Sequence, residues 1–161
     1  DAEPHLYAAQ LDAEGVVTIA GEFELIARST DGGNHWTVLH QGARSLFGLA
    51  AGPNGRLFAV GQEGVILKSG DNGKSWSTPP SGTSAILTGV WAGADGQAVV
   101  AVGVRAILIS RDGGSSFAPA PAFASTAAGN VYSTAQGAGQ PGAQQAVSIG
   151  GARGEILRLN F

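Results

Sequence analysis

Short apolar runs recur along the whole chain, and glycine-rich turn residues separate them. Between residues 46 and 85 these runs cover 46–51, 56–61, 65–69 and 75–78. They have the length of β-strands and are too short for buried helices. Runs such as 98–102 are apolar at successive positions, which indicates that both faces of the strand are buried. We therefore expect an all-β chain whose sheets stack face to face, with no helix longer than one turn.

The runs repeat with a period of about 40 residues. Asp31, Asp71 and Asp112 lie 40 and 41 residues apart, and Gly21, Gly61 and Gly103 keep a similar spacing. Four strands in about 40 residues are typical of one β-propeller blade. The sequence thus predicts a single domain over residues 1–161, a β-propeller-type array of four-stranded antiparallel blades. Its repeats cover about 6–45, 46–85, 86–125 and 126–161.

The fourth repeat is expected to be incomplete. Residues 151–158 match residues 61–68, but the chain reaches Phe161 where the second repeat has Asp71. The segment from 119 to 145, rich in Ala, Gly, Gln and Pro, is interpreted as mostly loop. A partial propeller and a ring completed by a second copy both remain open.

Each of the first three repeats carries an Asp-x-Gly-x-x-Trp/Phe run. An Asp at the start of a turn can accept hydrogen bonds from turn amides, and the Gly supplies a left-handed backbone conformation. The aromatic residue can then pack between blades. An identical turn repeated three times indicates a structural role, not a catalytic one, for this set: Asp31, Gly33, Trp36, Asp71, Gly73, Trp76, Asp112, Gly114 and Phe117.

Composition excludes several classes of protein. The net charge is −3 without a block of basic residues, which argues against nucleic-acid binding. The chain has no cysteine, and His5, His35 and His40 lack metal-ligand spacing, so we expect surface imidazoles and no metal. The run 137–142 spells Gly-x-Gly-x-x-Gly, but no helix could follow it, and we expect no cofactor. No apolar run is long enough to insert into a membrane.

The run Asp-x-Gly-x-x-Trp, following Gly-x-x-Gly-x-Ile-Leu-x-Ser in the second repeat, resembles the Asp-box, or bacterial neuraminidase, repeat. The combination is most similar to the photosystem II assembly and stability factor-like family of β-propellers. This resemblance implies a non-catalytic, periplasmic or secreted scaffold that binds protein during assembly of a membrane-associated complex. The alternative is a carbohydrate-binding or sialidase-like glycosidase Asp-box protein, although six blades need more residues than this chain has.

The best candidate binding site is one face of the array. In a propeller, the turns between the second and third strands and the links between blades share one side. This side should carry Arg44, Arg105, Arg153, Glu22, Glu24 and Glu63. We expect an acidic half from the first two repeats and a basic half from the last two, suited to a protein partner. A solvated rim without a partner is the alternative. Tyr7 and Tyr132 are expected in innermost strands, as core or channel-lining residues.

Overall fold

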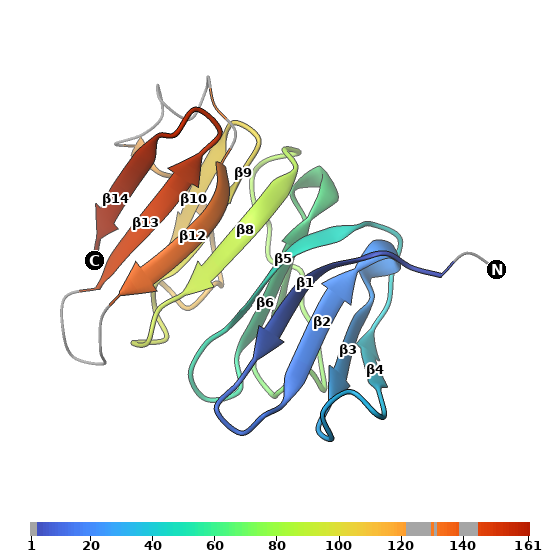
Figure 1. Ribbon diagram of the computed structural model, residues 1–161. Coiled ribbons are helices and arrows are strands. Elements are labelled where there is room, and N and C mark those ends of the chain that lie inside the picture. Colours follow the sequence, from blue (N-terminus) through green and yellow to red (C-terminus); the bar gives the residue numbers. More distant parts are fainter. Residues whose placement is uncertain (1–2, 122–129, 131, 139–144) are drawn as a thin grey trace.

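The apolar runs form four antiparallel sheets, which we call blades 1 to 4 (Figure 1). The computed structural model describes residues 3–121, 130, 132–138 and 145–161. Blade 1 consists of β1 (Leu6–Leu11), β2 (Val17–Gly21), β3 (Ile26–Ser29) and β4 (Thr37–His40). Blade 2 consists of β5 (Leu46–Ala51), β6 (Leu57–Gly61) and β7 (Ile66–Ser69). Blade 3 consists of β8 (Leu87–Ala92), β9 (Val99–Gly103), β10 (Ala106–Ser110) and β11 (Ala118–Pro119). Blade 4 consists of β12 (Tyr132–Ala138), β13 (Ala146–Gly151) and β14 (Ile156–Asn160).

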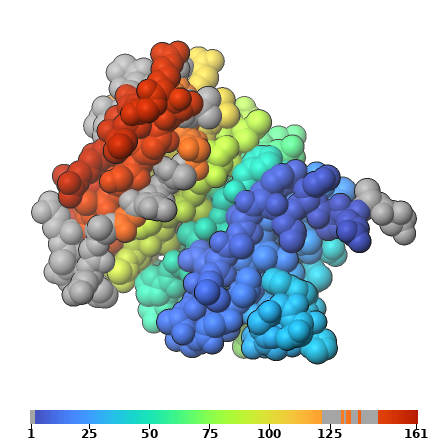
Figure 2. Space-filling model, in the orientation of Figure 1, coloured from blue at the N-terminus to red at the C-terminus, as the bar shows by residue number. Residues whose placement is uncertain are grey.

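The first strands of neighbouring blades lie side by side. In this way β1 contacts β5, β5 contacts β8, and β8 contacts β12. The later strands of each blade follow outward in chain order, so that blades 1 and 4 lie at opposite ends of the array (Figures 1 and 2). The fold is therefore the predicted β-propeller-type array, with β1, β5, β8 and β12 as its innermost strands.

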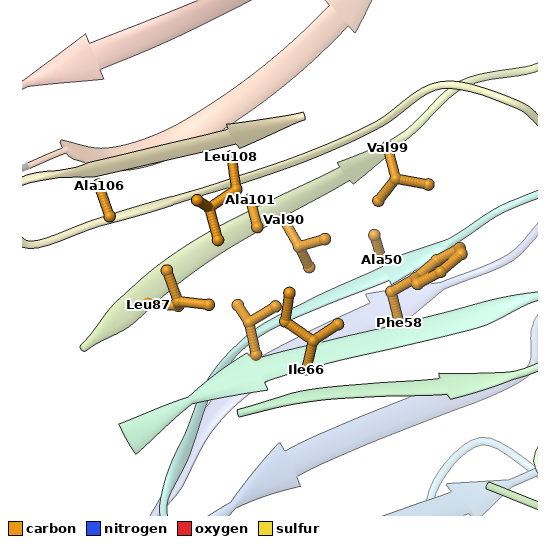
Figure 3. Packing of buried hydrophobic residues seen from close by; sticks show 10 residues of the cluster. Ala50, Phe58, Ile66, Leu87, Val90, Val99, Ala101, Ala106 and Leu108 are labelled. Carbon is orange, nitrogen blue, oxygen red and sulfur yellow. The ribbon is translucent and has the colours of Figure 1, made fainter. Parts of the chain in front are cut away.

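Apolar side chains fill the space between each pair of neighbouring blades. Between blades 2 and 3, Phe58 and Ile66 pack against Leu87, Val99 and Leu108, and all five are buried (Figure 3). Two similar clusters join blade 1 to blade 2 and blade 3 to blade 4. Blades 2 and 3 are buried on both faces, which explains why their strands are apolar at successive positions.

Two sequence-based expectations need correction. The predicted outer strand at 75–78 is reduced to one bridge between Lys68 and Ser77, so the sheet of blade 2 has three strands. The segment from 119 to 145 is not mostly loop in its described part, because β12 lies within it and forms the innermost strand of blade 4. The rest of that segment, 122–129, 131 and 139–144, lies outside the described residues.

Helical structure in the described ranges is limited to short 3₁₀ turns, as the short apolar runs predict. Two of these turns, η1 (Glu22–Glu24) and η2 (Gln62–Gly64), connect β2 to β3 and β6 to β7. No helix in this part of the chain has the length and apolar character needed to cross a membrane.

Candidate functional site

In blades 1 to 3, the turns between the second and third strands lie over the start of the innermost strands. In blades 1 and 2, the N–H groups of Glu22 and Gln62 donate to the carbonyls of His5 and Ser45, each at 2.9 Å. In blade 3, the Val104 N–H donates in the same way to Ile86 at 2.8 Å. We call this side of the array the turn end. The opposite side, which carries the β1–β2, β5–β6 and β8–β9 loops, is the hairpin end.

Close backbone approach at the turn end explains the repeating glycines. A Cβ added at Gly21, Gly61 or Gly103 would run into the carbonyl oxygen of His5, Ser45 or Ile86, respectively. These carbonyls accept the hydrogen bonds that hold the turns in place. Only glycine leaves room for this packing.

The tips of these turns have a left-handed backbone although they carry large side chains. Phe23, Glu63 and Arg105 occupy equivalent positions, with φ of 56°, 55° and 57°. Arg153 aligns with these residues in the sequence of blade 4, but its φ is not positive. Non-glycine residues are uncommon at such φ values, and they concentrate at functional sites. Glu63, Arg105 and Arg153 were predicted from the sequence, whereas Phe23, which is 53% exposed, was not.

Apolar side chains accompany the charged tips at the turn end. Leu6 and Tyr7 begin β1, Ile86 precedes β8, and all three are exposed. The ring of Tyr7 lies 5.1 Å from the ring of Phe47 at the start of β5. Tyr7 thus lies in an innermost strand, as predicted, but its exposed side chain is not part of the core. Aromatic residues are enriched in protein interfaces, so a surface of exposed Tyr and Phe beside charges is suited to docking a protein.

A buried carboxylate links blade 1 to the start of blade 2. Glu24 is 5% exposed, and its oxygens accept hydrogen bonds from Arg44 Nε at 2.7 Å and His40 Nε2 at 3.0 Å. Burial alone would raise the pKa of Glu24, but the two hydrogen bonds and the Arg44 charge outweigh it and lower that pKa. The sequence placed His40 among surface imidazoles; its side chain is instead largely buried.

Glu22 and Glu155 each anchor the beginning of an innermost strand. The Glu22 carboxylate accepts hydrogen bonds from the backbone N–H of His5 at 2.9 Å and from Tyr7 Oη at 3.2 Å, and the first of these lowers the pKa of Glu22. Glu155 accepts hydrogen bonds from Asn130 at 2.8 Å and from the hydroxyl of Tyr132 at 3.1 Å. Tyr132 is fully buried, as expected of a core residue, and burial raises its pKa.

The six residues predicted for the partner face thus have different roles. Arg44 and Glu24 form an ion pair with each other, and Glu22 is held by His5 and Tyr7. Glu63, Arg105 and Arg153 remain exposed at the turn tips. The acidic tip belongs to blade 2 and the two basic tips to blades 3 and 4.

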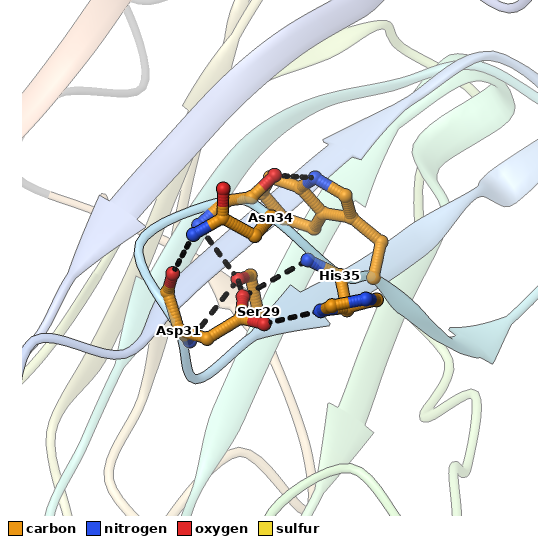
Figure 4. Close-up of polar contacts among 6 residues, drawn as sticks. Ser29, Asp31, Asn34 and His35 are labelled. Carbon is orange, nitrogen blue, oxygen red and sulfur yellow. Dashed lines mark hydrogen bonds and ion pairs between the residues drawn. The ribbon is translucent and has the colours of Figure 1, made fainter.

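The three Asp turns lie at the hairpin end and are tightly hydrogen-bonded. In blade 1, Asp31 Oδ1 accepts hydrogen bonds from Ser29 Oγ at 2.8 Å and from the His35 N–H at 2.9 Å (Figure 4). Ser29 Oγ in turn accepts the Gly33 N–H at 2.8 Å, and Gly33 has a φ of 94°. The turns around Asp71 and Asp112 repeat this network.

In blades 2 and 3, the aromatic residue of the Asp turn packs toward the preceding blade. Trp76 packs into the cluster between blades 1 and 2, and Phe117 packs into the cluster between blades 2 and 3. Trp36 has no preceding blade in the structure and is 42% exposed. The Trp36 and Trp76 indoles donate to the carbonyls of Gly33 and Gly73, at 3.0 Å and 3.1 Å.

Among the cavities formed by the described residues, two lie at the hairpin end near the innermost strands. One, of about 220 Å³, lies between blades 1 and 2 and is lined by Asp12, Glu14, Arg28 and Arg56 among others. The second, of about 370 Å³, lies along the innermost strands and is lined by Gln10, Leu49, Trp91 and Gly137 among others. The described residues contain no group of three or more side chains placed to hold a metal ion.

Comparison with solved structures identifies the architecture. YCF48 from Cyanidioschyzon merolae matches with a TM-score of 0.74 at 15% identity, over 96% of this chain and 50% of the other. YCF48 bound to a D1 peptide matches with a TM-score of 0.62 at 13% identity, over 96% and 68%. An ancestral GH74 enzyme matches with a TM-score of 0.60 at 14% identity, over 96% and 25%.

The fold is a partial β-propeller. This chain spans about half the length of the YCF48 structure from Cyanidioschyzon merolae. No family model matches the sequence, and no curated protein matches it. At sequence identities of 13–15%, these similarities show the fold of the chain and not its activity.

Proposed function

We propose that this chain is part of a non-catalytic Asp-box β-propeller that binds a segment of a protein partner at the turn end. The observation that carries the proposal is the turn end itself, where strained, exposed tips lie beside exposed aromatic side chains. Similarity in fold to YCF48, one structure of which holds a D1 peptide, supports a role in protein assembly. The partner belongs to a membrane-associated complex in this proposal, and the protein is exported.

Binding at the turn end would combine aromatic side chains that pack against the partner with charged side chains that orient it. Phe23 and the Tyr7–Phe47 pair offer aromatic surface, and aromatic residues are enriched in protein interfaces, where a few residues carry most of the binding energy. Arg105 and Arg153 place positive charge on blades 3 and 4, whereas Glu63 places negative charge on blade 2. Exposed charges of this kind guide orientation and encounter more than they add affinity, and salt screens them over about 8–10 Å.

A peptide array with the protein labelled at its N-terminus tests this proposal. The probes are extended peptides that combine one aromatic residue with acidic, neutral or basic flanks. We expect acidic peptides to bind best, and the Arg105→Glu, Arg153→Glu variant to weaken their binding at least about tenfold. The wild-type affinity should fall as salt is raised.

The matched control reverses a charge at the other end of the array. Lys74 is exposed in the Asp turn of blade 2 at the hairpin end, so Lys74→Glu should leave peptide binding unchanged. Equal effects of Lys74→Glu and the arginine reversals would contradict the proposed location. An array without any binding peptide would contradict the function.

A second candidate is carbohydrate binding or cleavage. It is favoured by similarity in fold to an ancestral GH74 enzyme and by the carboxylates of Asp12 and Glu14 in the cavity between blades 1 and 2. A glycan array and a panel of fluorogenic glycosides, sialosides included, separate the two functions. Turnover that Glu14→Gln abolishes would establish the enzyme instead of the scaffold.

A further inference from the structure

The turn tip of blade 1 contains a charged residue where blade 2 has glycine. Phe23 and Glu24 both have a left-handed backbone, with φ of 56° and 47°. In blade 2 the same two positions hold Glu63 and Gly64, with φ of 55° and 69°. Glycine adopts this conformation freely, whereas a residue with a side chain is strained in it. Because Glu24 is also only 5% exposed, blade 1 combines backbone strain with a buried carboxylate at one position.

The end of β4 and the linker to blade 2 enclose this carboxylate. His40 Nε2 lies 3.0 Å from one oxygen of Glu24, and Arg44 Nε donates to the other oxygen at 2.7 Å. Between these two residues, a Cβ added at Gly42 would run into the carboxylate, so the linker passes close beside it. The ring of His40 also lies 5.8 Å from the ring of Trp76, which packs between the two blades. The carboxylate is thus held from the side of blade 2.

Two backbone hydrogen bonds fasten the tip to the same linker. The Gly42 N–H donates to the carbonyl of Phe23 at 2.7 Å, and the Glu24 N–H donates to the carbonyl of Arg44 at 2.6 Å. Among the backbone hydrogen bonds of the described residues, none joins the tip of blade 2, at 63–64, to the linker that follows it. The linker therefore fixes the tip of blade 1 in a way that has no counterpart in blade 2.

Phe23 is the residue that this arrangement presents to solvent, with 53% of its surface exposed. Exposure at such a tip does not require a missing neighbour, because Glu63 is exposed although blade 2 contacts both blade 1 and blade 3. A loop that is already held in its binding conformation loses less freedom on association and binds more tightly.

We propose that Glu24 is a positioning residue for the binding site at the turn end. Its carboxylate joins the tip to the linker, and the fixed tip presents Phe23 to an aromatic side chain of the partner segment. This inference rests on the proposed function. Glu24 itself is buried and contacts no partner; it acts through Phe23.

A double-mutant cycle on peptide affinity tests this role. With the acidic aromatic peptide that binds the wild-type protein best, Phe23→Ala and Glu24→Gly should each weaken binding at least about tenfold. The double variant should bind no more weakly than Phe23→Ala alone, and losses that multiply would overturn the proposal. Glycine relieves the strained backbone at position 24, and the side chains of Arg44 and His40 already reach solvent. We therefore expect Glu24→Gly to fold, which far-UV circular dichroism and the Tm check.

A pair of glycine substitutions provides the matched control. The Cβ of Gly42→Ala displaces the Glu24 carboxylate and should weaken peptide binding as Glu24→Gly does. Gly70 lies at the hairpin end, where an added Cβ meets no atom within 4 Å, so Gly70→Ala should leave binding unchanged. Equal affinities of the two alanine variants would contradict a positioning role for the carboxylate.

Amide hydrogen exchange measured by NMR gives a readout that requires no peptide. The Gly42 N–H should exchange at least about tenfold faster in Glu24→Gly than in the wild-type protein, because its bond to Phe23 is no longer held. The Gly52 N–H, which donates to the carbonyl of Arg56 at 2.9 Å at the hairpin end, should exchange equally in both. Unchanged exchange at Gly42 would show that Glu24 does not hold the tip.

The outcomes separate this inference from the proposed function. A wild-type protein that binds no peptide would contradict the proposed function. Wild-type binding that Phe23→Ala weakens and Glu24→Gly leaves unchanged would contradict the positioning role of Glu24 alone.

Discussion

The substitution Gly61→Ala tests whether close backbone approach at the turn end holds neighbouring strands together. A Cβ at this position would meet the Ser45 carbonyl oxygen first and would lie 2.9 Å from both Ser45 C and Leu46 Cα. Real Cβ atoms essentially never come this near to backbone atoms, so the start of β5 must move. That movement stretches the hydrogen bond from Gln62 to Ser45 and displaces Leu46, which is fully buried between blades 1 and 2.

The expected loss in free energy of unfolding follows from these two effects. Overpacking in a well-packed region costs about 1–3 kcal/mol, and a weakened backbone hydrogen bond costs about 0.5–1.5 kcal/mol. We therefore expect Gly61→Ala to destabilise the protein by about 2–4 kcal/mol, a large share of the stability of a small domain. Urea denaturation followed by tryptophan fluorescence measures this loss as a shift in the midpoint.

Gly70→Ala is the matched control for this experiment. Gly70 is exposed at the hairpin end, and a Cβ there meets no atom within 4 Å. Its replacement should leave the free energy of unfolding unchanged or raise it by about 0.4–1 kcal/mol, because alanine lowers the conformational entropy of the unfolded chain. If the two variants differ by less than about 0.5 kcal/mol, the close approach does not determine the need for glycine.

Two further predictions concern the packing of the core and the dependence of stability on pH. Phe58→Ala leaves a cavity in the cluster between blades 2 and 3 and should lower the free energy of unfolding, measured by urea denaturation, by about 3–5 kcal/mol. Val38 is 54% exposed, so a larger loss for Val38→Ala than for Phe58→Ala would contradict the packing. The turn hydrogen bonds lower the pKa of Asp31 and Asp71 to about 2, from an ordinary 3.8. Their contribution to stability is thus complete above pH of about 4 and falls as the pH drops toward 2. Circular dichroism should show that the Tm falls as the pH drops through this range, and that it falls less steeply with pH in Asp71→Asn. A Tm that does not change with acid would refute the role of the turns.

The spacing of residues along the chain was sufficient to determine the repeating unit. Runs of five to seven apolar residues between glycine turns predict strands, and the 40-residue interval between Asp31 and Asp71 predicts the blade. These properties are local, because strand length, turn conformation and double-sided burial each leave a pattern in neighbouring residues. For the same reason Tyr132 could be placed in an innermost strand from the sequence.

Contacts between distant residues were decided by the tertiary structure alone. No sequence pattern shows that Glu24 binds both His40 and Arg44, that Phe23 is exposed on a left-handed turn, or that Gly61 faces Ser45. The sequence encodes which residues are apolar, but the side of a sheet on which they meet a neighbour, or meet none, depends on how the blades stack.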